Sequence, residues 1–244
     1  MPTGWLCRFR EADVTDLQVD GPVVGLARRR VLADEVADAI RNAIFAGQID
    51  LGQRLVEEEM ASNLNVSRGP VREALVLLAQ EGLVRMERHR GATVAQLDLK
   101  GVHEIYSLRT ALERLAAECI CRRASAEDFG RIAAVLERFD HLPRPLTRSG
   151  VAGVDLAFHD AVFQAAHHER LYRAWLSLRS QIFLYLVHRG ALHQDFGQSW
   201  LKDHEDLLEV LVRRKPGPAL KLVEDHIEGP YQRVLQANRD PSAL

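Results

Sequence analysis

The feature that most constrains the fold is a change in hydrophobic period at Gly82. Before it, the stretch NVSRGPVREALVLLAQEG begins with turn-forming residues and then becomes apolar at helical spacing. The apolar face of this predicted helix consists of Val71, Ala74, Leu75 and Leu78. After Gly82, the segments LVRMER and ATVAQL alternate apolar and polar residues as strands do, with the tight turn HRG between them. The pattern therefore predicts a helix followed directly by a β-hairpin.

Two further helices are predicted upstream of this stretch. A four-residue step of apolar side chains predicts an amphipathic helix from Val31 to Gly47. A turn with Gly52 follows, and then a short helix, EEEMASNL, which has acidic residues in its first turn where the helix dipole favours them. Over residues 30–97 the order is therefore three helices and two strands, which is typical of a winged helix-turn-helix domain. Residues 1–29 show no sustained period and are predicted to form a flexible arm.

The rest of the chain, residues 98–238, carries helical periods only and predicts an all-helical domain. The first of its helices begins near Leu99, and its apolar stripe is expected to contain Ile105, Leu108, Leu112, Leu115 and Cys119. Later helices are expected at about 126–140, 151–167, 169–190, 198–213 and 218–237. The sequence KPGP at 215–218 predicts a break between the last two. The fold class is thus mainly α, with a winged helix-turn-helix domain before a helical bundle.

The charge balance limits the kinds of partner that the chain can bind. The chain has 32 Lys plus Arg and 34 Asp plus Glu, so a nucleic-acid partner requires a local basic surface. Only three cysteines are present, which suits a reducing compartment. No apolar run is long enough to span a bilayer, and the acidic N-terminus makes a poor signal peptide. We expect a cytoplasmic protein with no membrane partner.

Two arginines near the start of the third helix suggest that it binds DNA. Arg68 and Arg72 are spaced i, i+4 and lie on a face other than the apolar one. Ser67 is expected to cap the helix with its hydroxyl, and Gly69 lets the helix end approach a surface closely. Such a helix end can enter the major groove, where arginine recognises guanine. The alternative is a solvated helix whose arginines pair with Glu73 or with the acidic run at 57–59.

The predicted hairpin adds basic residues at its tip. Arg88, His89 and Arg90 can reach phosphates or the minor groove as a wing, and Gly91 is available for a positive φ. Residues 28–95 contain ten basic and ten acidic residues, so this domain has no net basic charge. DNA affinity must therefore come from the placement of a few arginines, and from doubled contacts in a dimer.

Four residues in the helical domain have spacing suited to a metal site. Asp155 and His159 are spaced i, i+4 on one predicted helix. His204 and His226 lie about eleven residues before and after the centre of the KPGP turn, so a helix hairpin brings them level. Three imidazoles and a carboxylate suit a divalent transition metal. Taken singly, each pair also fits an ordinary hydrogen bond or a surface histidine.

Arg109 lies at the edge of the first apolar stripe of the helical domain and needs an anionic partner. Glu113, at i+4, can supply it. The functional alternative is the carboxylate of a small ligand that is held between Arg109 and the metal. A metal-dependent hydrolase with a nucleic-acid-binding module is a rival interpretation of the same residues, although no general base is evident beside them. A structural metal domain without ligand sensing is a third.

With these motifs in view, the chain resembles GntR-type bacterial transcription regulators over about residues 30–237. It is most similar to the subfamily with an all-helical ligand-sensing domain, called FCD. The resemblance rests on LNVSRGPVREALVLLAQEGLV with HRGATVA, and on D-x-x-x-H followed by His204 and His226. Arg109 in LRTALE matches an arginine that often faces the ligand in that family. The chain departs from the family at Gly69, where a threonine is usual, and so lacks a hydroxyl that could contact DNA.

The resemblance also implies partners and a mode of action. It implies a homodimer that binds a palindromic double-stranded DNA operator, commonly as a repressor. It implies a small organic acid as the effector, which loosens DNA binding. The implied metal is zinc, nickel or manganese, and it is not catalytic.

Overall fold

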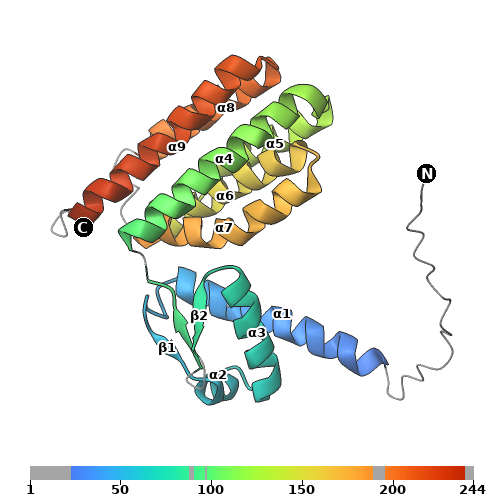
Figure 1. Cartoon of the computed structure of the whole chain (residues 1–244), viewed down its shortest axis with the longest axis vertical. Coiled ribbons are helices and arrows are strands. Elements are labelled where there is room, and N and C mark those ends of the chain that lie inside the picture. Colours follow the sequence, from blue (N-terminus) through green and yellow to red (C-terminus); the bar gives the residue numbers. More distant parts are fainter. Residues whose placement is uncertain (1–22, 88–90, 97, 189–195, 240–244) are drawn as a thin grey trace, which may run out of the picture.

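The computed structural model describes residues 23–87, 91–96, 98–188 and 196–239. They form a small N-terminal domain and a larger helical bundle, which lie one below the other in Figure 1. The elements of the N-terminal domain are α1 (Val23–Phe45), β1 (Arg54–Leu55), α2 (Glu57–Asn63), α3 (Arg68–Gln80), β2 (Val84–Glu87) and β3 (Gly91–Val94). The bundle consists of α4 (Leu99–Arg123), α5 (Ala126–Asp140), α6 (Arg148–Ala165), α7 (Glu169–His188), α8 (Phe196–Val212) and α9 (Pro216–Arg239). The predicted class, mainly α with a winged helix-turn-helix domain before a helical bundle, is confirmed.

The sheet contains one strand that the sequence pattern did not predict. Its order is β1-β3-β2, and both pairs are antiparallel. β1 has only two residues, so it is too short to show an alternating period. At the other side of β3, the predicted hairpin forms, and Gly91 has φ +87° as expected. A Cβ at Gly91 would lie 2.8 Å from the carbonyl oxygen of Leu55, so the close pairing with β1 also favours glycine there.

The first helix starts earlier than its apolar period suggested. α1 begins at Val23, whereas the pattern predicted a start at Val31 and a flexible arm over residues 1–29. For residues 23–29 that prediction is corrected. The segment VVGLARRR has no apolar stripe, but leucine, alanine and arginine favour the helix without one. Residues 1–22 lie outside the described part of the chain.

Helix α3 has the predicted buried face but not the predicted cap. Val71, Ala74, Leu75 and Leu78 are all fully buried, and α3 packs against α1. Ser67 occupies the N-cap position, yet its hydroxyl makes no capping hydrogen bond to the described residues. An N-cap side chain bonds the N–H of the second or third helical residue, and the third is Pro70, which has none. The first-turn N–H groups are therefore left available at this end of α3.

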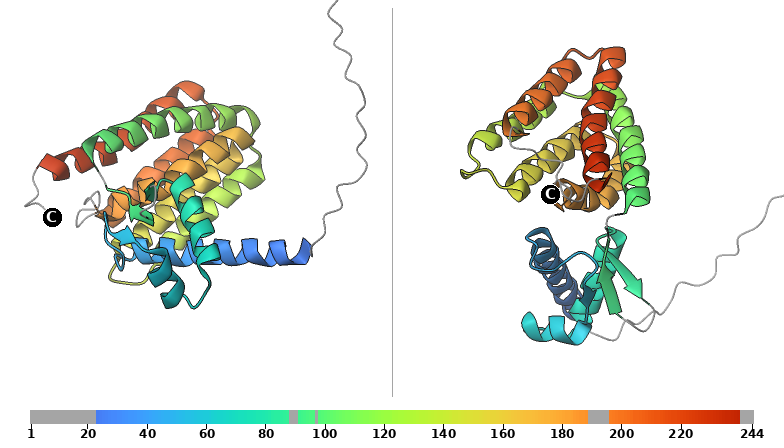
Figure 2. Two further views of the ribbon diagram at one scale, coloured as in Figure 1. Left: turned by 60° about the horizontal axis from the view of Figure 1, so that its bottom comes forward. Right: turned by 90° about the vertical axis from the view of Figure 1, so that its left-hand side faces the viewer.

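The helices of the bundle are gathered into one body in both views of Figure 2. α4 packs against α9, α7 and α6, and α8 lies beside α9 as the predicted helix hairpin requires. Pro216 begins α9, where its missing N–H costs no helical hydrogen bond. The break thus falls just before the PGP sequence, with Arg214 at φ +54°. No helix in the described ranges combines the length and the apolar character that a membrane crossing needs.

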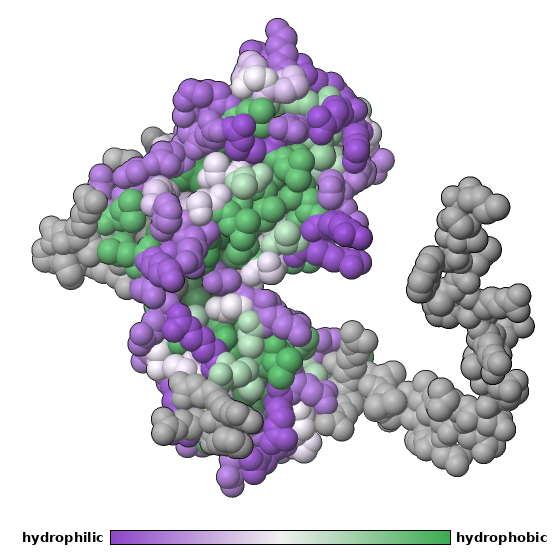
Figure 3. Space-filling view, in the orientation of Figure 1, coloured by the Kyte–Doolittle hydropathy of each residue, from purple (hydrophilic) through white to green (hydrophobic). Residues whose placement is uncertain are grey.

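The predicted apolar stripe of α4 is partly wrong. Ile105 and Cys119 are buried, but Leu108 is 47% exposed and Leu115 is 38% exposed. The buried face of α4 instead includes the charged residues Arg109 and Glu113. The prediction failed because it assumed that charged side chains face water, whereas here a paired arginine and glutamate are buried. Figure 3 shows hydrophobic surface gathered over the bundle where α4 crosses its front.

Two contacts join the N-terminal domain to helix α7 of the bundle. Glu81, which follows α3, accepts hydrogen bonds at 2.9 Å from Arg41 Nε and from Ser180 Oγ. The rings of Phe45 and Phe183 pack with centroids 4.0 Å apart. The end of the predicted recognition helix is therefore attached directly to α7.

Asp128 is expected to be a main stabilising residue of the bundle. Its buried carboxylate accepts two hydrogen bonds from Ser125, from the N–H at 2.7 Å and from the hydroxyl at 2.8 Å, as part of a capping box. It also accepts one from His167 Nε2 at 2.8 Å. Burial opposes ionisation, but these donors hold the pKa of Asp128 well below its usual value. We expect Asp128→Ala to lower the free energy of unfolding by about 2 kcal/mol near neutral pH.

The matched control for this variant is Glu127→Ala. Glu127 precedes Asp128, but its side chain is 82% exposed and contacts Arg131, so we expect a loss of under about 0.5 kcal/mol. Because the folded-state pKa of Asp128 is depressed, its contribution is present above the unfolded pKa of about 4 and is lost as the pH falls. Chemical denaturation should therefore show the difference between wild type and Asp128→Ala shrinking below about pH 4. A difference that does not change with pH would contradict this assignment.

Candidate functional site

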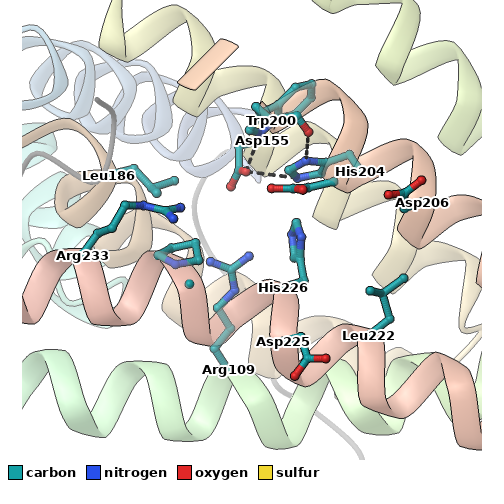
Figure 4. Close-up of a pocket in the computed structure, with 13 residues that line it drawn as sticks. Arg109, Asp155, Leu186, Trp200, His204, Asp206, Leu222, Asp225, His226 and Arg233 are labelled. Atoms are coloured by element: carbon teal, nitrogen blue, oxygen red, sulfur yellow. Dashed lines mark hydrogen bonds and ion pairs between the residues drawn. The ribbon is translucent and has the colours of Figure 1, made fainter. Parts of the chain in front are cut away.

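The four predicted metal ligands converge inside the bundle. Asp155 and His159 come from α6, His204 from α8 and His226 from α9. Ligand nitrogens of the three histidines all lie within 4.8 Å of one another. Figure 4 shows Asp155, His204 and His226 directed toward a common space. The helix spacing and the level of the α8–α9 hairpin therefore bring these residues together as the sequence predicted.

His204 and Asp155 are oriented by a tryptophan that the sequence pattern did not reveal. His204 Nδ1 lies 2.7 Å from the carbonyl oxygen of Trp200, so this nitrogen must carry the proton and donate. The Trp200 indole N–H donates to Asp155 Oδ1 at 2.8 Å. His204 Nε2 lies 3.2 Å from Asp155 Oδ1, and Asp155 Oδ2 is buried without a hydrogen-bond partner among the described residues. Such outer contacts fix metal ligands while leaving their free atoms to face the ion.

The Nδ1 atom of His159 faces the carboxylate of Glu113, just as Nδ1 of His204 faces the carbonyl of Trp200. His159 is fully buried, and its Nδ1 lies 3.0 Å from Glu113 Oε2. Its other nitrogen, Nε2, faces His226 Nε2 at 3.4 Å and Asp155 Oδ2 at 4.0 Å. Burial, with the neighbouring His204 and His159, keeps the pKa of His226 well below the usual value, so His226 is neutral. Neutral imidazole is the form that binds metals.

The donor set fits a divalent transition metal. It offers three imidazole nitrogens and one carboxylate oxygen. This set suits zinc, nickel or manganese better than magnesium, which prefers oxygen ligands only. Asp155 Oδ2, which has no hydrogen-bond partner among the described residues, supports the same interpretation. A buried polar atom without a partner is costly, and a bound ion would remove that cost.

Arg109 forms the ion pair that the sequence allowed, and one further contact. Its Nε donates to Glu113 Oε1 at 2.7 Å, and both side chains are buried. Burial opposes their charges, but His159 and Arg109 lower the pKa of Glu113 to about 2. Arg109 Nη2 also lies 2.7 Å from His159 Nε2. An ion bound to that nitrogen would take the same lone pair, so metal binding requires the Arg109 guanidinium to shift toward the cavity.

A cavity of about 180 Å³ adjoins the cluster. Its lining residues include Arg109, Asp155, Trp200, His204, His226 and Arg233. Arg233 was not predicted, although it lies seven residues after His226 and therefore on the same face of α9. In Figure 4 the guanidinium groups of Arg109 and Arg233 both point into this space.

Near the cavity mouth, two of the acidic residues are paired with lysines. Lys202 binds Asp206 at 3.0 Å, and Lys221 binds Asp225 at 2.8 Å. A third acidic residue in the lining, Asp203, is exposed. The lining also contains Arg109 and Arg233, whose guanidinium groups can donate to an anionic ligand.

The predicted DNA-facing arginines lie together on the surface of the N-terminal domain. Arg68 and Arg72 are each 60% exposed. Arg72 donates two hydrogen bonds to Glu57 of α2, at 3.0 and 2.7 Å, and Arg68 Nη2 lies 3.6 Å from the same carboxylate. The sequence left open that these arginines pair with the acidic run at 57–59 instead of contacting DNA. In the structure, which contains no DNA, they pair with Glu57 of that run.

The other predicted DNA-facing residues are only partly described. Ser67 and Gly69 lie at the N-terminal end of α3, where the first-turn N–H groups are available. Gly91 begins β3. Arg88, His89 and Arg90 lie outside the described residues.

Comparisons with known proteins match both domains. Residues 32–94 match the model of bacterial regulatory proteins of the gntR family, and residues 104–229 match the FCD domain. The gluconate operon transcriptional repressor of Bacillus subtilis (strain 168) is 30% identical over 82% of this chain and 83% of its own length. The Uxu operon transcriptional regulator of Escherichia coli (strain K12) is 29% identical over 83% of this chain and 86% of its own.

A solved structure shows the same fold. The crystal structure of a putative transcriptional regulator GntR from Rhodococcus sp. RHA1 has a TM-score of 0.70 at 24% identity, over 84% of this chain and 97% of that one. The matched relatives are transcription regulators, so the hydrolase alternative has no support. The chain therefore belongs to the gntR family of bacterial regulatory proteins, carries an FCD domain, and is a transcription regulator rather than an enzyme.

Proposed function

We propose that the protein is a cytoplasmic, homodimeric repressor that is released from a palindromic operator by a small organic acid bound at a metal. The observation that carries this proposal is the convergence of Asp155, His159, His204 and His226 beside a cavity that Arg109 also lines. Asp155 Oδ2, which is buried without a hydrogen-bond partner among the described residues, supports a resident ion. Zinc, nickel or manganese would serve as a Lewis acid that binds a carboxylate oxygen of the effector.

The effector is expected to be a carboxylic acid because of Arg109. When the ion takes His159 Nε2, the guanidinium loses that contact but keeps Glu113 through Nε. Its remaining N–H groups can then donate to a carboxylate that also touches the metal. The Bacillus subtilis relative is named for a gluconate operon, and gluconate is a carboxylic acid.

DNA binding is assigned to the N-terminal end of α3. Its available N–H groups and helix dipole favour a phosphate, and Arg68 and Arg72 lie beside them. Glu57 holds Arg72 in the absence of DNA, and this pairing keeps the two arginines on one side of the helix. On an operator, the same side chains would exchange Glu57 for phosphates and guanine edges.

Two routes connect the cavity with the DNA-binding domain. α4, which carries Arg109, begins at Leu99, only five residues after β3 ends at Val94. α7 contributes Leu186 to the cavity wall, and six residues earlier its Ser180 donates a hydrogen bond to Glu81, just after α3. Movement of either helix on effector binding would change the position of α3, and the spacing of two half-sites tolerates little change.

The exposed apolar face of α4 supports the proposed homodimer. Leu108 and Leu115 are seven residues apart, so they lie on one side of the helix, and both are exposed. A second copy that covered this face would remove the leucines from water. The same contact would fix the distance between two α3 helices, as a palindromic operator requires.

Operator binding tests the DNA assignment. A DNA site is first selected from a random pool with the wild-type protein. We expect Arg68→Ala to weaken binding to that site by about tenfold to a hundredfold. The reason is the loss of a base or phosphate contact at the N-terminal end of α3. Fluorescence anisotropy with labelled DNA gives the affinity.

The control is Arg173→Ala, which removes an arginine that is 75% exposed on α7 and paired with Glu169. It should bind the site as wild type does. If Arg68→Ala also keeps the wild-type affinity, then Arg68 is only a surface partner of Glu57.

A further inference from the structure

The residue that follows a proposed metal ligand is bound to a neighbouring helix. His159 of α6 belongs to the cluster, and Asp160, the next residue, accepts hydrogen bonds from two residues of α7. The indole N–H of Trp175 donates to Asp160 Oδ1 at 2.6 Å. The guanidinium of Arg179 binds both oxygens, with Nε 3.0 Å from Oδ1 and Nη2 2.6 Å from Oδ2. A two-point contact of this kind fixes the geometry of both side chains, so α6 and α7 are held together beside His159.

The same segment of α7 holds the end of α3. Ser180 follows Arg179 directly, is 3% exposed, and donates from its hydroxyl to Glu81 Oε2 at 2.9 Å. Arg41 of α1 donates to the same oxygen through Nε at 2.9 Å and binds the other oxygen through Nη2. The Glu81 carboxylate therefore joins α7 and α1 to the C-terminal end of α3. Figure 1 shows α7 on the side of the bundle nearest to the N-terminal domain.

These contacts form an unbroken series from the cluster to α3. Peptide bonds join His159 to Asp160 and Arg179 to Ser180. Side-chain hydrogen bonds join Asp160 to Arg179 and Ser180 to Glu81. The two carboxylates of the series are only 20% and 23% exposed, so water and salt screen them less than they screen a surface pair.

The junction of α1, α3 and α7 has room for a change of arrangement. A groove of about 420 Å³ adjoins Arg41 and Glu81 and is also lined by Leu176 and Ser177 of α7. This groove leaves space for the Glu81 carboxylate to move away from Ser180. Packed interfaces switch between discrete arrangements instead of deforming smoothly, so a small shift of α7 can break the hydrogen bond.

We propose that Asp160, Arg179, Ser180 and Glu81 form a relay, the α7 relay, that transmits ligand binding at the cluster to α3. This inference rests on the proposed function and names the contacts that connect its two sites. A ligand that displaces His159 moves Asp160 with it, and the bound Arg179 carries the movement to α7. Ser180 then shifts relative to Glu81, and α3 changes position. Contiguous side-chain networks of this kind carry coupling between distant sites.

The α7 relay is expected to carry at least half of the coupling free energy, with the rest passing through α4. We define the response as the factor by which an acid lowers operator affinity. A hydrogen bond to a charged group changes an equilibrium by about tenfold or more, which lies within the range of typical allosteric coupling. A wild-type response of about fiftyfold should therefore fall to about sevenfold or less when the relay is cut.

Two substitutions cut the relay at separate points. Ser180→Ala removes the hydroxyl that reaches Glu81, and Arg179→Met removes the guanidinium that binds Asp160. Fluorescence anisotropy gives the response of zinc-loaded full-length protein on the DNA site that wild type selects from a random pool. The acid is the one among acetate, lactate, succinate, gluconate and citrate that most raises the melting temperature of zinc-loaded wild type. Both variants should bind zinc, this acid and the DNA site within about threefold of wild type, yet lose most of the response.

Each variant has a matched control on α7. The hydroxyl of Ser177, one turn before Ser180, donates to the carbonyl oxygen of Ala174 in its own helix at 2.7 Å. Arg173 is 75% exposed and pairs with Glu169 of the same helix. Ser177→Ala and Arg173→Met should therefore keep the full response. A purely structural role for Ser180 or Arg179 would change the melting temperature of its variant and leave the response intact.

Two further measurements test whether the contacts act as one series. Coupling is reciprocal, so the selected DNA should weaken acid binding to wild type by the same factor, and should do so much less in the variants. Isothermal titration of the acid gives this factor. The double variant Arg179→Met with Ser180→Ala should lose no more of the response than the more affected single variant, because both substitutions cut the same relay.

The outcomes separate the relay from the proposed function. If wild type responds and either Ser180→Ala or Arg179→Met keeps the wild-type response, the relay is wrong and the proposed function stands. A variant that loses zinc, acid or DNA binding also overturns the relay, because its contact then maintains one site and does not join two. If no acid of the panel binds zinc-loaded wild type, or none changes its operator affinity, the proposed function fails and the relay fails with it.

Discussion

The His204→Ala variant should purify without a divalent metal, whereas wild-type protein should carry about one ion per chain. In the proposed site His204 would supply its Nε2, which lies 3.2 Å from Asp155 Oδ1, and its ring is held in place by the Trp200 carbonyl. Metal that binds only the folded protein stabilises it by about 2.7 kcal/mol at a hundred times its dissociation constant. Elemental analysis and melting curves with and without zinc should therefore show both the ion and its stabilisation in wild type, and neither in His204→Ala.

His141 provides a matched control for this variant. Its Nδ1 contacts the carbonyl oxygen of Glu137 at 2.8 Å, four residues earlier, just as His204 contacts Trp200. His141 is exposed and lies outside the cluster, so His141→Ala should keep both the metal and the shift in melting temperature. Wild-type protein that takes up neither zinc, nickel nor manganese would show that the cluster is only a buried hydrogen-bond network.

The second large effect is expected at Arg109. Arg109→Ala should keep the metal and bind DNA, but DNA release by the acid should disappear. The Arg109 guanidinium can donate hydrogen bonds to an acid that is bound at the metal, and Arg109 belongs to α4. The chain runs from α4 back to β3 of the DNA-binding domain over a few residues. Coupling of about 1–3 kcal/mol, which is typical of allosteric proteins, corresponds to a change in operator affinity of about fivefold to 150-fold. Anisotropy measurements of operator binding, with and without acid, give this factor for each variant.

Removal of Arg109 alone leaves Glu113 buried without its ion-pair partner, which is strongly destabilising in general. The double variant Arg109→Met with Glu113→Gln removes both charges and retains much of the side-chain volume. It should fold, bind DNA and still fail to respond. A normal response in the double variant would make Arg109 a structural partner of Glu113 and nothing more.

The parts of the molecule that could be predicted are those whose signals are periodic or fixed by helix geometry. The apolar face of α3 follows from a simple period, and Gly82 marks where that period changes. Asp155 and His159 lie together because they are one turn apart. His204 and His226 meet because they are equally far from the break between α8 and α9.

The parts that could not be predicted depend on contacts between residues far apart in the sequence. Trp200 is a routine apolar residue in its own helix, and its role appears only where its ring and carbonyl meet Asp155 and His204. Ser67 has the residue type of a cap, but Pro70 removes one of the two N–H groups that it could bind. Arg233 is the exception, because its seven-residue spacing from His226 was visible in the sequence.

The most direct test is the operator affinity of one preparation under four conditions, with metal and acid each present or absent. The acid is the tightest binder found when small carboxylates are screened by their effect on the melting temperature of the metal-loaded protein. The proposed function predicts that the acid lowers operator affinity by about fivefold to 150-fold when the metal is bound, and has little effect after the metal is removed. An acid that binds the metal-loaded protein yet leaves the operator affinity unchanged would contradict the proposed function.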